Sequence, residues 1–267
     1  MRDAVVAEYR KLVTTRMWWV LLLALAAYLA FIGVALAFSI VVAAENEEGD
    51  LMLSGVDAAA SIYGLTNAIG YVFPLVIGSL AMTTEFRHQT ITQSLLVEPR
   101  RGVFLGAKLL ATLPLGLLYG VVATAAVVLA SAPVLAVLGD GAFLTEPDII
   151  EVLLLSVVVT ALWAMIGVAF GSVLTNQVAA IVVILAFTQF VEPIARVALG
   201  AFDALDGVAK FLPGAAADGL IGASFLGSMD GGSADLLPRW AALLVMLAYA
   251  GILAGVGRFT TLRRDIG

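Results

Sequence analysis

Long uncharged apolar runs alternate with short polar segments along this chain. Residues 58–84 and 109–139 contain no charged side chain, and neither do residues 17–44 and 152–191. A helix of about 20 apolar residues crosses a bilayer, so each run is long enough to span a membrane. The pattern predicts an all-α integral membrane protein with one transmembrane domain over residues 1–267. Its six spans are expected at about 17–43, 61–82, 104–137, 152–174, 178–199 and 240–257.

The run 152–191 decides the number of crossings. As a single helix its 40 residues would extend about 60 Å, which is roughly twice the hydrocarbon thickness of a bilayer. The run must therefore contain two spans, and its only polar break, Thr175-Asn176-Gln177, is the predicted turn. Six crossings in total also place both basic termini on one side of the membrane.

Three segments are expected to depart from simple straight spans. The second span is predicted to be kinked or broken, because it carries Gly64, Asn67, Gly70 and Pro74. Residues 1–16 are amphipathic, which favours a helix in the interface plane, and the alternative is a frayed basic tail. Residues 200–238 form an outer segment, of which 211–229 are apolar but rich in glycine and proline. There we expect either a pair of short re-entrant or interfacial helices or a plain loop.

The composition supports a membrane protein and narrows its chemistry. The chain is 62% hydrophobic and 13% charged, with a mean hydropathy of +1.06, whereas soluble domains are about 45–50% apolar and 25% charged. The absence of cysteine excludes disulfides and thiolate metal sites. The single histidine, His88, argues against a histidine-based metal site or catalytic triad, and it is interpreted as an exposed or hydrogen-bonding residue.

The cations are distributed unevenly along the chain. The two termini and residues 84–108 hold 11 of the 14 lysine and arginine residues, and the other three are Arg196, Lys210 and Arg239. By the positive-inside rule, both termini and the 84–103 loop are predicted to face the cytoplasm. The acids, 15 of 20 of which lie outside these segments, are consistent with that orientation.

Familiar catalytic motifs are missing, but one ionisable residue lies close to membrane depth. There is no GxxxxGK[ST] motif, so the chain is not expected to hydrolyse ATP in the P-loop manner, and there is no HExxH or GxSxG motif. Gln189 precedes Glu192 by about one helical turn, and Arg196 follows it by one. Two interpretations remain open: a gate or substrate contact near the outer leaflet, or a structural pair at a helix end.

The stretch from Thr84 to Lys108 is the only strongly polar, mixed-charge segment between two apolar runs. It combines acidic, basic, hydroxyl and apolar residues, among them Glu85, Arg87, Thr90, 95–97, Arg100 and Arg101. Its composition again leaves two interpretations. The stretch is either a short helix that docks its polar face onto a partner while its apolar side lies on the bilayer, or a solvated loop.

Four motifs follow one another along the chain. They are Glu8-Tyr9-Arg10-Lys11-Leu12 ahead of two tryptophans, Thr84-Glu85-Phe86-Arg87-His88-Gln89-Thr90-Ile91 followed by Pro99-Arg100-Arg101 and Lys108, Phe211-Leu212-Pro213-Gly214, and the ending Arg263-Arg264-Asp265. Together they resemble the permease subunits of the ABC-2 class of ABC transporters, especially short six-span permeases of high-GC Gram-positive bacteria. Gln89 departs from this pattern, because the family commonly has glycine there, and a side chain at this position is expected to alter the local turn.

The resemblance implies a transmembrane permease subunit of an exporter in the bacterial plasma membrane. Two such chains, identical or homologous, would associate with two P-loop ATP-binding subunits. ATP and Mg²⁺ would bind those partners, and this chain would be no enzyme, carry no cofactor or metal and bind no nucleic acid. The cargo would be a hydrophobic or amphipathic drug, lipid, peptide or glycolipid, which leaves along the interface between the two permeases within the membrane lipid.

The same resemblance implies which residues receive the motion of the ATP-binding subunits. In the loop these are Glu85, Arg87, Thr90, Arg100 and Arg101, and in the N-terminal cytoplasmic helix they are Glu8, Arg10 and Lys11.

Two other functions are alternatives. An ion-coupled secondary transporter usually carries midplane ionisable groups and repeat symmetry, and neither is evident in the sequence. An intramembrane enzyme, such as a glutamic protease that uses Glu85 or Glu192, needs a second acid, base or metal ligand at membrane depth, and the sequence reveals none.

Overall fold

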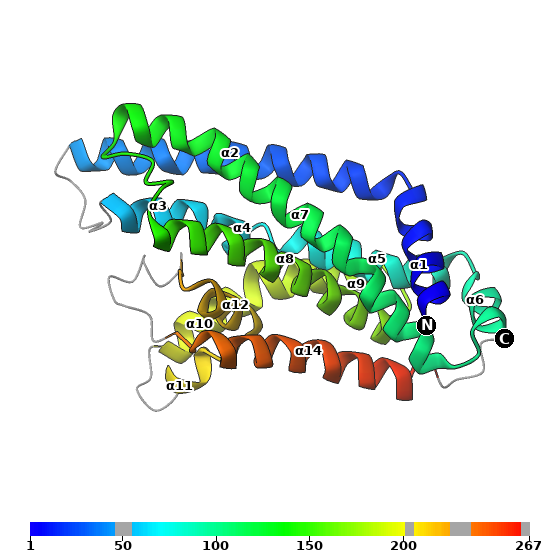
Figure 1. Cartoon of the computed structure of the whole chain (residues 1–267). Coiled ribbons are helices and arrows are strands. Elements are labelled where there is room, and N and C mark those ends of the chain that lie inside the picture. The colour runs from blue at the N-terminus through cyan, green and yellow to red at the C-terminus, as the bar shows by residue number, and fades with distance from the viewer. Residues whose placement is uncertain (46–54, 201–205, 225–235, 263–267) are drawn as a thin grey trace.

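A computed structural model describes residues 1–45, 55–200, 206–224 and 236–262, which form helices and turns without any strand (Figure 1). The helices are α1 (Arg2–Thr14), α2 (Met17–Glu45), α3 (Gly55–Tyr63), α4 (Leu65–Ala68), α5 (Val72–Arg87), α6 (Ile91–Val97), α7 (Arg101–Leu138), α8 (Pro147–Val173), α9 (Gln177–Ala186), the π-helix η1 (Phe187–Val191), α10 (Glu192–Gly200), α11 (Asp206–Ala209), α12 (Pro213–Ile221) and α14 (Arg239–Phe259).

Six helical segments of the described chain are long and apolar enough to cross a membrane, which confirms the predicted all-helical architecture with six spans. They are Met17–Val42, Gly55–Arg87, Arg101–Leu138, Pro147–Val173, Gln177–Gly200 and Arg239–Phe259. The second of these segments combines α3, α4 and α5, and the fifth combines α9, η1 and α10.

The second span is broken, as its residues predicted. The span consists of three helical pieces, α3, α4 and α5. Gly64 immediately precedes α4, and Gly70 lies between α4 and α5. Pro74 falls in the first turn of α5, where a backbone N–H has no partner within the helix, so the proline removes no helical hydrogen bond. The break matters for the site, because Asn67 and Tyr71 lie in and beside it and both are buried.

The second and fourth spans form a central pair, and the other four spans surround it. α8 packs against α5, α7 and α14, and it lies in the middle of the bundle in Figure 1. The most apolar stretches of the second and fourth spans are 78% and 67% buried within this chain, whereas those of the other four are 22–33% buried. The outer four spans therefore present apolar faces that lipid or another protein chain would cover.

Glycines bring α5 and α8 into direct backbone contact. A methyl group on Gly78 would collide with the carbonyl oxygen of Ala164, and one on Gly167 would collide with that of Leu75. Close approach of this kind supplies the van der Waals contact that holds helices together in lipid. By contrast, Gly251 of α14 meets no described atom outside its own helix within 4 Å.

A short turn joins α8 to α9 at the predicted polar break. Asn176 caps α9, because its side-chain oxygen accepts hydrogen bonds from the amides of Val178 at 3.0 Å and Ala179 at 3.1 Å. These bonds satisfy two of the N–H groups that a helix start leaves without partners. The 40-residue apolar run therefore contains two separate helical spans.

The two ends of the bundle carry different elements. α1 and α6 lie at one end, and α10, α11 and α12 lie at the other (Figure 1). Within the predicted 211–229 segment, Pro213–Ile221 form a helix that is buried among α4, α8 and α14, which excludes a plain loop there. Its relation to the bilayer, and the side on which the termini lie, stay predictions. Residues 225–229 and the ending 263–267 lie outside the described residues.

Candidate functional site

Four charged side chains meet at the α1 end, and we call them the lysine network: Glu8, Lys11, Glu85 and Lys108. Lys108 Nζ lies 2.7 Å from Glu85 Oε1 and also forms an ion pair with Glu8 Oε2. Lys11 Nζ pairs with Glu8 Oε1 and lies 3.0 Å from Glu85 Oε1. The network joins α1, α5 and α7, so the structure brings together the N-terminal helix and the 84–103 loop.

Most of the lysine network is shielded from water. Lys108 is 2% exposed, and Glu8 and Glu85 are 5% and 6% exposed. Buried charges are costly unless they are paired and hydrogen-bonded, and here two lysines balance two glutamates. Lys108 Nζ also donates to the carbonyl oxygen of Ala81 at 3.1 Å, so each ammonium hydrogen has an acceptor.

Lys11 lies at the rim of the lysine network, outside the spans, with a side chain that is 45% exposed. Partial burial alone would lower the pKa of Lys11, but the hydrogen bonds and negative charges of Glu8 and Glu85 outweigh it and raise that pKa above 10.5. Lys11 is therefore positively charged at neutral pH. Its Nζ also donates to Ser94 Oγ at 3.0 Å, which links α1 directly to α6.

The turn after α5 gives position 89 a left-handed backbone, which glycine adopts more readily than other residues. The Gln89 amide donates to the Phe86 carbonyl at 3.2 Å, and the Thr90 amide donates to the Glu85 carbonyl at 3.0 Å. These two bonds define a Schellman motif, which needs left-handed backbone at the residue after the helix cap. Gln89 has that conformation, with φ of +55°. Its side chain has not prevented the turn, but the backbone is strained, since a Cβ is disfavoured there.

Two arginines of the predicted coupling set hold the loop against neighbouring helices. Arg87 Nη1 donates to Gln177 Oε1 at 3.0 Å, at the start of α9. Arg101 Nη1 donates to the carbonyl oxygen of Leu262, just beyond α14. The loop therefore contacts the ends of two spans besides its own two, and the lysine network also ties it to the N-terminal helix α1.

The exposed surface at the α1 end of the bundle carries both basic and apolar side chains. Arg10 is exposed on α1, and the Arg100 side chain is 71% exposed beside Glu98 at 2.8 Å. The hydrogen bond from Arg100 lowers the pKa of Glu98, so the pair is ionised at neutral pH. On α6, Leu96 and Val97 are 79% and 88% exposed. The polar stretch from Thr84 to Lys108 therefore contains a short helix, α6, and the C-terminal end of this helix is apolar and exposed.

A second buried polar cluster lies at the α12 end, and we call it the arginine network: Asn67, Tyr71, Glu192, Arg196 and Asp218. Arg196 Nη1 lies 2.7 Å from Asp218 Oδ2, and Nη2 lies 3.4 Å from Glu192 Oε1. Asn67 donates to Asp218 Oδ1 and accepts a hydrogen bond from Trp163 Nε1 at 3.1 Å. Glu192 and Asp218 are 1% and 4% exposed. The predicted Glu192–Arg196 pair is therefore part of a larger network that includes a second acid.

The helical span that carries Glu192 contains a π-helical turn, and the Tyr71 hydroxyl supplies a hydrogen bond that this turn lacks. The Glu192 amide donates to the Phe187 carbonyl, five residues back. In this register the Thr188 carbonyl would pair with the amide of residue 193, but Pro193 has no N–H. The Tyr71 hydroxyl donates to that carbonyl oxygen at 3.1 Å and lies 3.3 Å from Glu192 Oε2.

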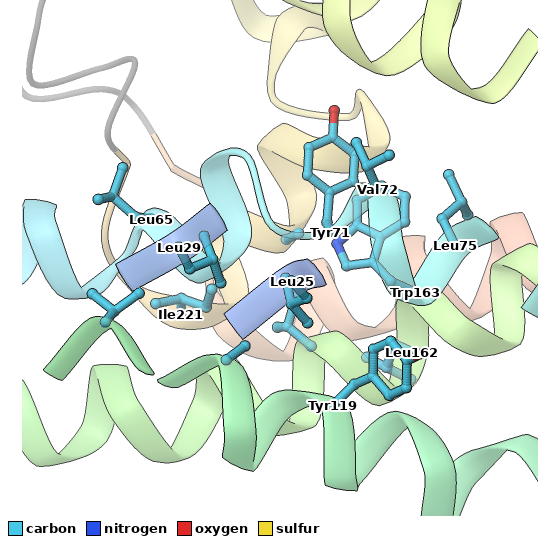
Figure 2. Packing of buried hydrophobic residues seen from close by; sticks show 14 of the residues in the cluster. Leu25, Leu29, Leu65, Tyr71, Val72, Leu75, Tyr119, Leu162, Trp163 and Ile221 are labelled. Atoms are coloured by element: carbon cyan, nitrogen blue, oxygen red, sulfur yellow. The ribbon is translucent and has the colours of Figure 1, made fainter. Parts of the chain in front are cut away.

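The arginine network rests on the apolar core. The Tyr71 ring packs on the indole of Trp163, with ring centroids 4.5 Å apart, and Figure 2 shows these side chains beside Val72 and Leu75 of α5. Trp163 belongs to α8, so the network is fixed to the central pair of spans. Gln189, which the sequence assigned to the same site, is exposed and lies outside the network.

Gly214 of the Phe211-Leu212-Pro213-Gly214 motif binds the same carboxylate. Its amide donates to Glu192 Oε1, at the N-terminus of α12, where a negative charge is favoured. A methyl group on Gly214 would contact both the Arg196 guanidinium and the Glu192 carboxylate. Pro213 opens α12, where no N–H is needed. The motif therefore presents a backbone amide to Glu192, and a Cβ at position 214 would force the Arg196 and Glu192 side chains to shift.

The cavity beside the arginine network is small. Its lining residues are Asn67, Ala68, Tyr71, Glu192, Pro193, Arg196 and Asp218. Its volume of about 20 Å³ gives room for one or two water molecules, whereas ligand pockets measure about 300–1,000 Å³. Of the two interpretations for Glu192, contact with a drug-sized or lipid substrate inside this chain does not fit this volume. A closed gate and a structural anchor both fit it.

Sequence reasoning missed several members of these networks. Lys108 marked the end of the polar stretch but was not assigned to the site, although a lone lysine at the start of a long apolar run is itself a signal. Asp218 lies in a segment whose structure the sequence left open. Asn67 and Tyr71 carry no charge, and only the break in the second span brings them to Arg196.

Among the described residues, no group of three or more histidine, cysteine, aspartate or glutamate side chains is arranged to hold a metal ion. No family model matches the chain, and a comparison with curated proteins finds no relative.

Proposed function

We propose that this chain is the transmembrane permease subunit of an ATP-driven ABC-2 type exporter. The main support is the arrangement at the α1 end, where the N-terminal helix and the 84–103 loop form one charged surface. Arg10, Arg87 and Arg100 are exposed on that surface. The lysine network fastens it to the ends of α5 and α7, so a force applied to the surface would reach the spans.

The energy source in this proposal is a separate P-loop ATP-binding subunit. The sequence contains no P-loop motif, and a permease needs a surface on which such a subunit can push. The basic composition of the α1 end orients it toward the cytoplasm by the positive-inside rule, where ATP is available. The chain then belongs to the bacterial plasma membrane with both termini inside.

A second permease chain completes the proposed exporter. The cavity beside the arginine network is too small for a hydrophobic or amphipathic cargo. Four of the six spans bury only 22–33% of their most apolar stretches within one chain. A route between two permease chains, identical or homologous, accommodates a larger cargo and covers part of these faces.

The test is capture of the ATP-binding subunit. The tagged full-length chain is purified in mild detergent, and associated proteins are identified by mass spectrometry. A P-loop ATPase is expected in near-stoichiometric amount, and the double variant Arg87→Gln/Arg100→Gln is expected to lose it. Glu85 is unsuitable for this test because it is buried, so its replacement would disturb the fold.

A matched control uses an arginine at the other end of the bundle. Arg239 forms an exposed ion pair with Glu151 there, so Arg239→Gln should retain the ATPase. If the unaltered chain captures no P-loop ATPase in several detergents, the proposal fails.

The arginine network favours a second candidate, an ion-coupled secondary transporter. Two buried carboxylates and a partly buried arginine lie within or beside the spans, and ionisable groups in such positions often mark ion pathways. The test is uptake into liposomes that contain the purified chain alone, driven by a proton or sodium gradient without ATP. Gradient-driven uptake that Glu192→Gln abolishes would establish this candidate instead.

The intramembrane enzyme has weaker support. Asp218 supplies the second acid that the sequence did not reveal, but Arg196 bridges Asp218 and Glu192. The cavity beside these two carboxylates has a volume of only about 20 Å³, which leaves no room for a peptide substrate. Peptide cleavage by the isolated chain that Glu192→Gln abolishes would support the enzyme.

A further inference from the structure

Lys108 connects three separate parts of the chain through one ammonium group. Its Nζ bonds to Glu8 of α1, to Glu85 at the end of α5 and to the Ala81 carbonyl oxygen one turn earlier. Nζ also lies 5.2 Å from the centre of the Phe104 ring. Since an ammonium group has three hydrogens, these three acceptors use its full bonding capacity.

The position of Lys108 differs from that of Lys11 in one decisive respect. Both lysines bind Glu8 and Glu85, but the Lys108 side chain is 2% exposed and the Lys11 side chain is 45% exposed. Exposed ion pairs contribute little, because water and salt screen them. Buried pairs are strongly coupled, since removing one partner leaves an uncompensated charge. Lys108 is therefore the lysine on which the geometry of α1 depends.

We propose that Lys108 is a positioning residue that holds α1 and the 84–103 loop as a single docking unit. This inference rests on the proposed function, because it gives the unit its purpose: to receive the motion of an ATP-binding subunit as one rigid body. Without Lys108, the Lys11 contacts to Glu85 and Ser94, which are at the rim, would be the remaining side-chain hydrogen bonds between α1 and the loop, beside the apolar packing of α1 on α7. This packing is non-directional, so α1 and the loop would then be less firmly held relative to each other.

A distance measurement tests the positioning directly. The chain has no cysteine, so Ala7→Cys on α1 and Gln93→Cys on α6, both exposed, can carry spin labels without other changes. Electron paramagnetic resonance on the full-length chain then gives the distribution of distances between α1 and α6. With Lys108→Met, the distribution is expected to shift to longer distances. With Lys11→Met, the shift is expected to be smaller.

A double variant separates positioning from mere charge balance. Lys108→Met leaves two glutamates with one lysine, and this buried excess charge lowers stability by itself. Glu8→Gln/Lys108→Met removes one charge of each sign, so its thermal midpoint should recover toward that of the unaltered chain. Its distance distribution should nevertheless stay shifted, because the ion pair between Glu8 of α1 and Lys108 of α7 is still absent.

Several outcomes would overturn the inference. One is an unchanged distribution for Lys108→Met, and another is a wild-type distribution for the double variant. A shift for Lys11→Met that equals or exceeds the shift for Lys108→Met would also contradict it.

Capture of the ATP-binding subunit distinguishes this inference from the proposed function. The folded double variant is expected to capture less ATPase than the unaltered chain. Normal capture despite shifted distances would overturn the docking role of Lys108. If even the unaltered chain captures none while the distances shift as expected, the proposed function fails, and the attachment of α1 through Lys108 stands.

Discussion

Gln89 holds a strained backbone conformation, so its replacement by glycine should stabilise the protein. Gln89 follows the cap of α5, with φ of +55°, and the Schellman bonds to Phe86 and Glu85 keep it there. The side chain is exposed, so Gln89→Gly removes little packing. The variant changes the backbone preference of this one residue and leaves the rest of the turn intact.

The size of the effect follows from two opposing terms. A left-handed backbone costs a residue with a Cβ roughly 1–2 kcal/mol, and glycine avoids this cost. Glycine loses more conformational freedom on folding, which opposes the gain by roughly 0.5–1 kcal/mol. Subtracting the two ranges gives a net stabilisation between about 0 and 1.5 kcal/mol, centred at about 0.75 kcal/mol, and for a chain of this length the central value raises the thermal midpoint by about 1.5–3 °C.

The assay is thermal unfolding of purified protein in detergent, with all variants heated at the same rate. Gln89→Ala is the matched control, because alanine keeps the Cβ and therefore the strain, and its midpoint should stay close to that of the unaltered chain. Gly222 supplies the reverse test, since it has φ of +83° after α12, and Gly222→Ala should lower the midpoint. A Gln89→Gly midpoint at or below that of Gln89→Ala would refute the reasoning.

Three further predictions concern single contacts. Gly214→Ala should destabilise the protein by about 1–3 kcal/mol through overpacking, while Gly251→Ala on the open face of α14 should leave the thermal midpoint unchanged or slightly raised; equal losses would argue against the close approach of α12 to Glu192. Asn176→Ala should lower the free energy of unfolding by about 1 kcal/mol because it removes the α9 cap. Asn176→Asp still offers a capping oxygen, so in the same unfolding assay it should keep most of the stability that the cap provides. Tyr71→Phe should cost about 1–3 kcal/mol because it leaves the Thr188 carbonyl buried without its hydroxyl partner, and an unchanged midpoint would show that this carbonyl finds another donor.

The spans could be predicted because lipid imposes a strict rule on the chain. In hydrocarbon every backbone polar group must bond within its own helix, so length and charge-free composition are enough to locate a span. The same reasoning split residues 152–191 at Asn176, where α9 begins. It also anticipated the break in the second span, because glycine and proline disturb a helix locally.

The candidate site could be predicted only in part, because pairing depends on three-dimensional contact. Glu192 and Arg196 lie one helical turn apart, so local spacing predicted their interaction. Asp218 comes from a helix that the sequence left unresolved, and its 22-residue separation from Arg196 gives no local signal. Lys108 and Glu8 are separated by 100 residues, and nothing in either neighbourhood specifies the other as its partner.

The sequence by itself therefore determined that this is a six-span helical membrane protein, where its main breaks lie and which of its segments are polar. Each of these properties depends on residues that are near one another along the chain. Only the tertiary structure decided that Glu85 is buried and not a surface contact, that Lys108 joins it to α1, and that α12 bonds to Glu192. The reason is that burial and ion pairing depend on which helices pack together. Close glycine contacts, such as that of Gly78 with α8, favour this packing over other helix arrangements that would bury similar apolar surface.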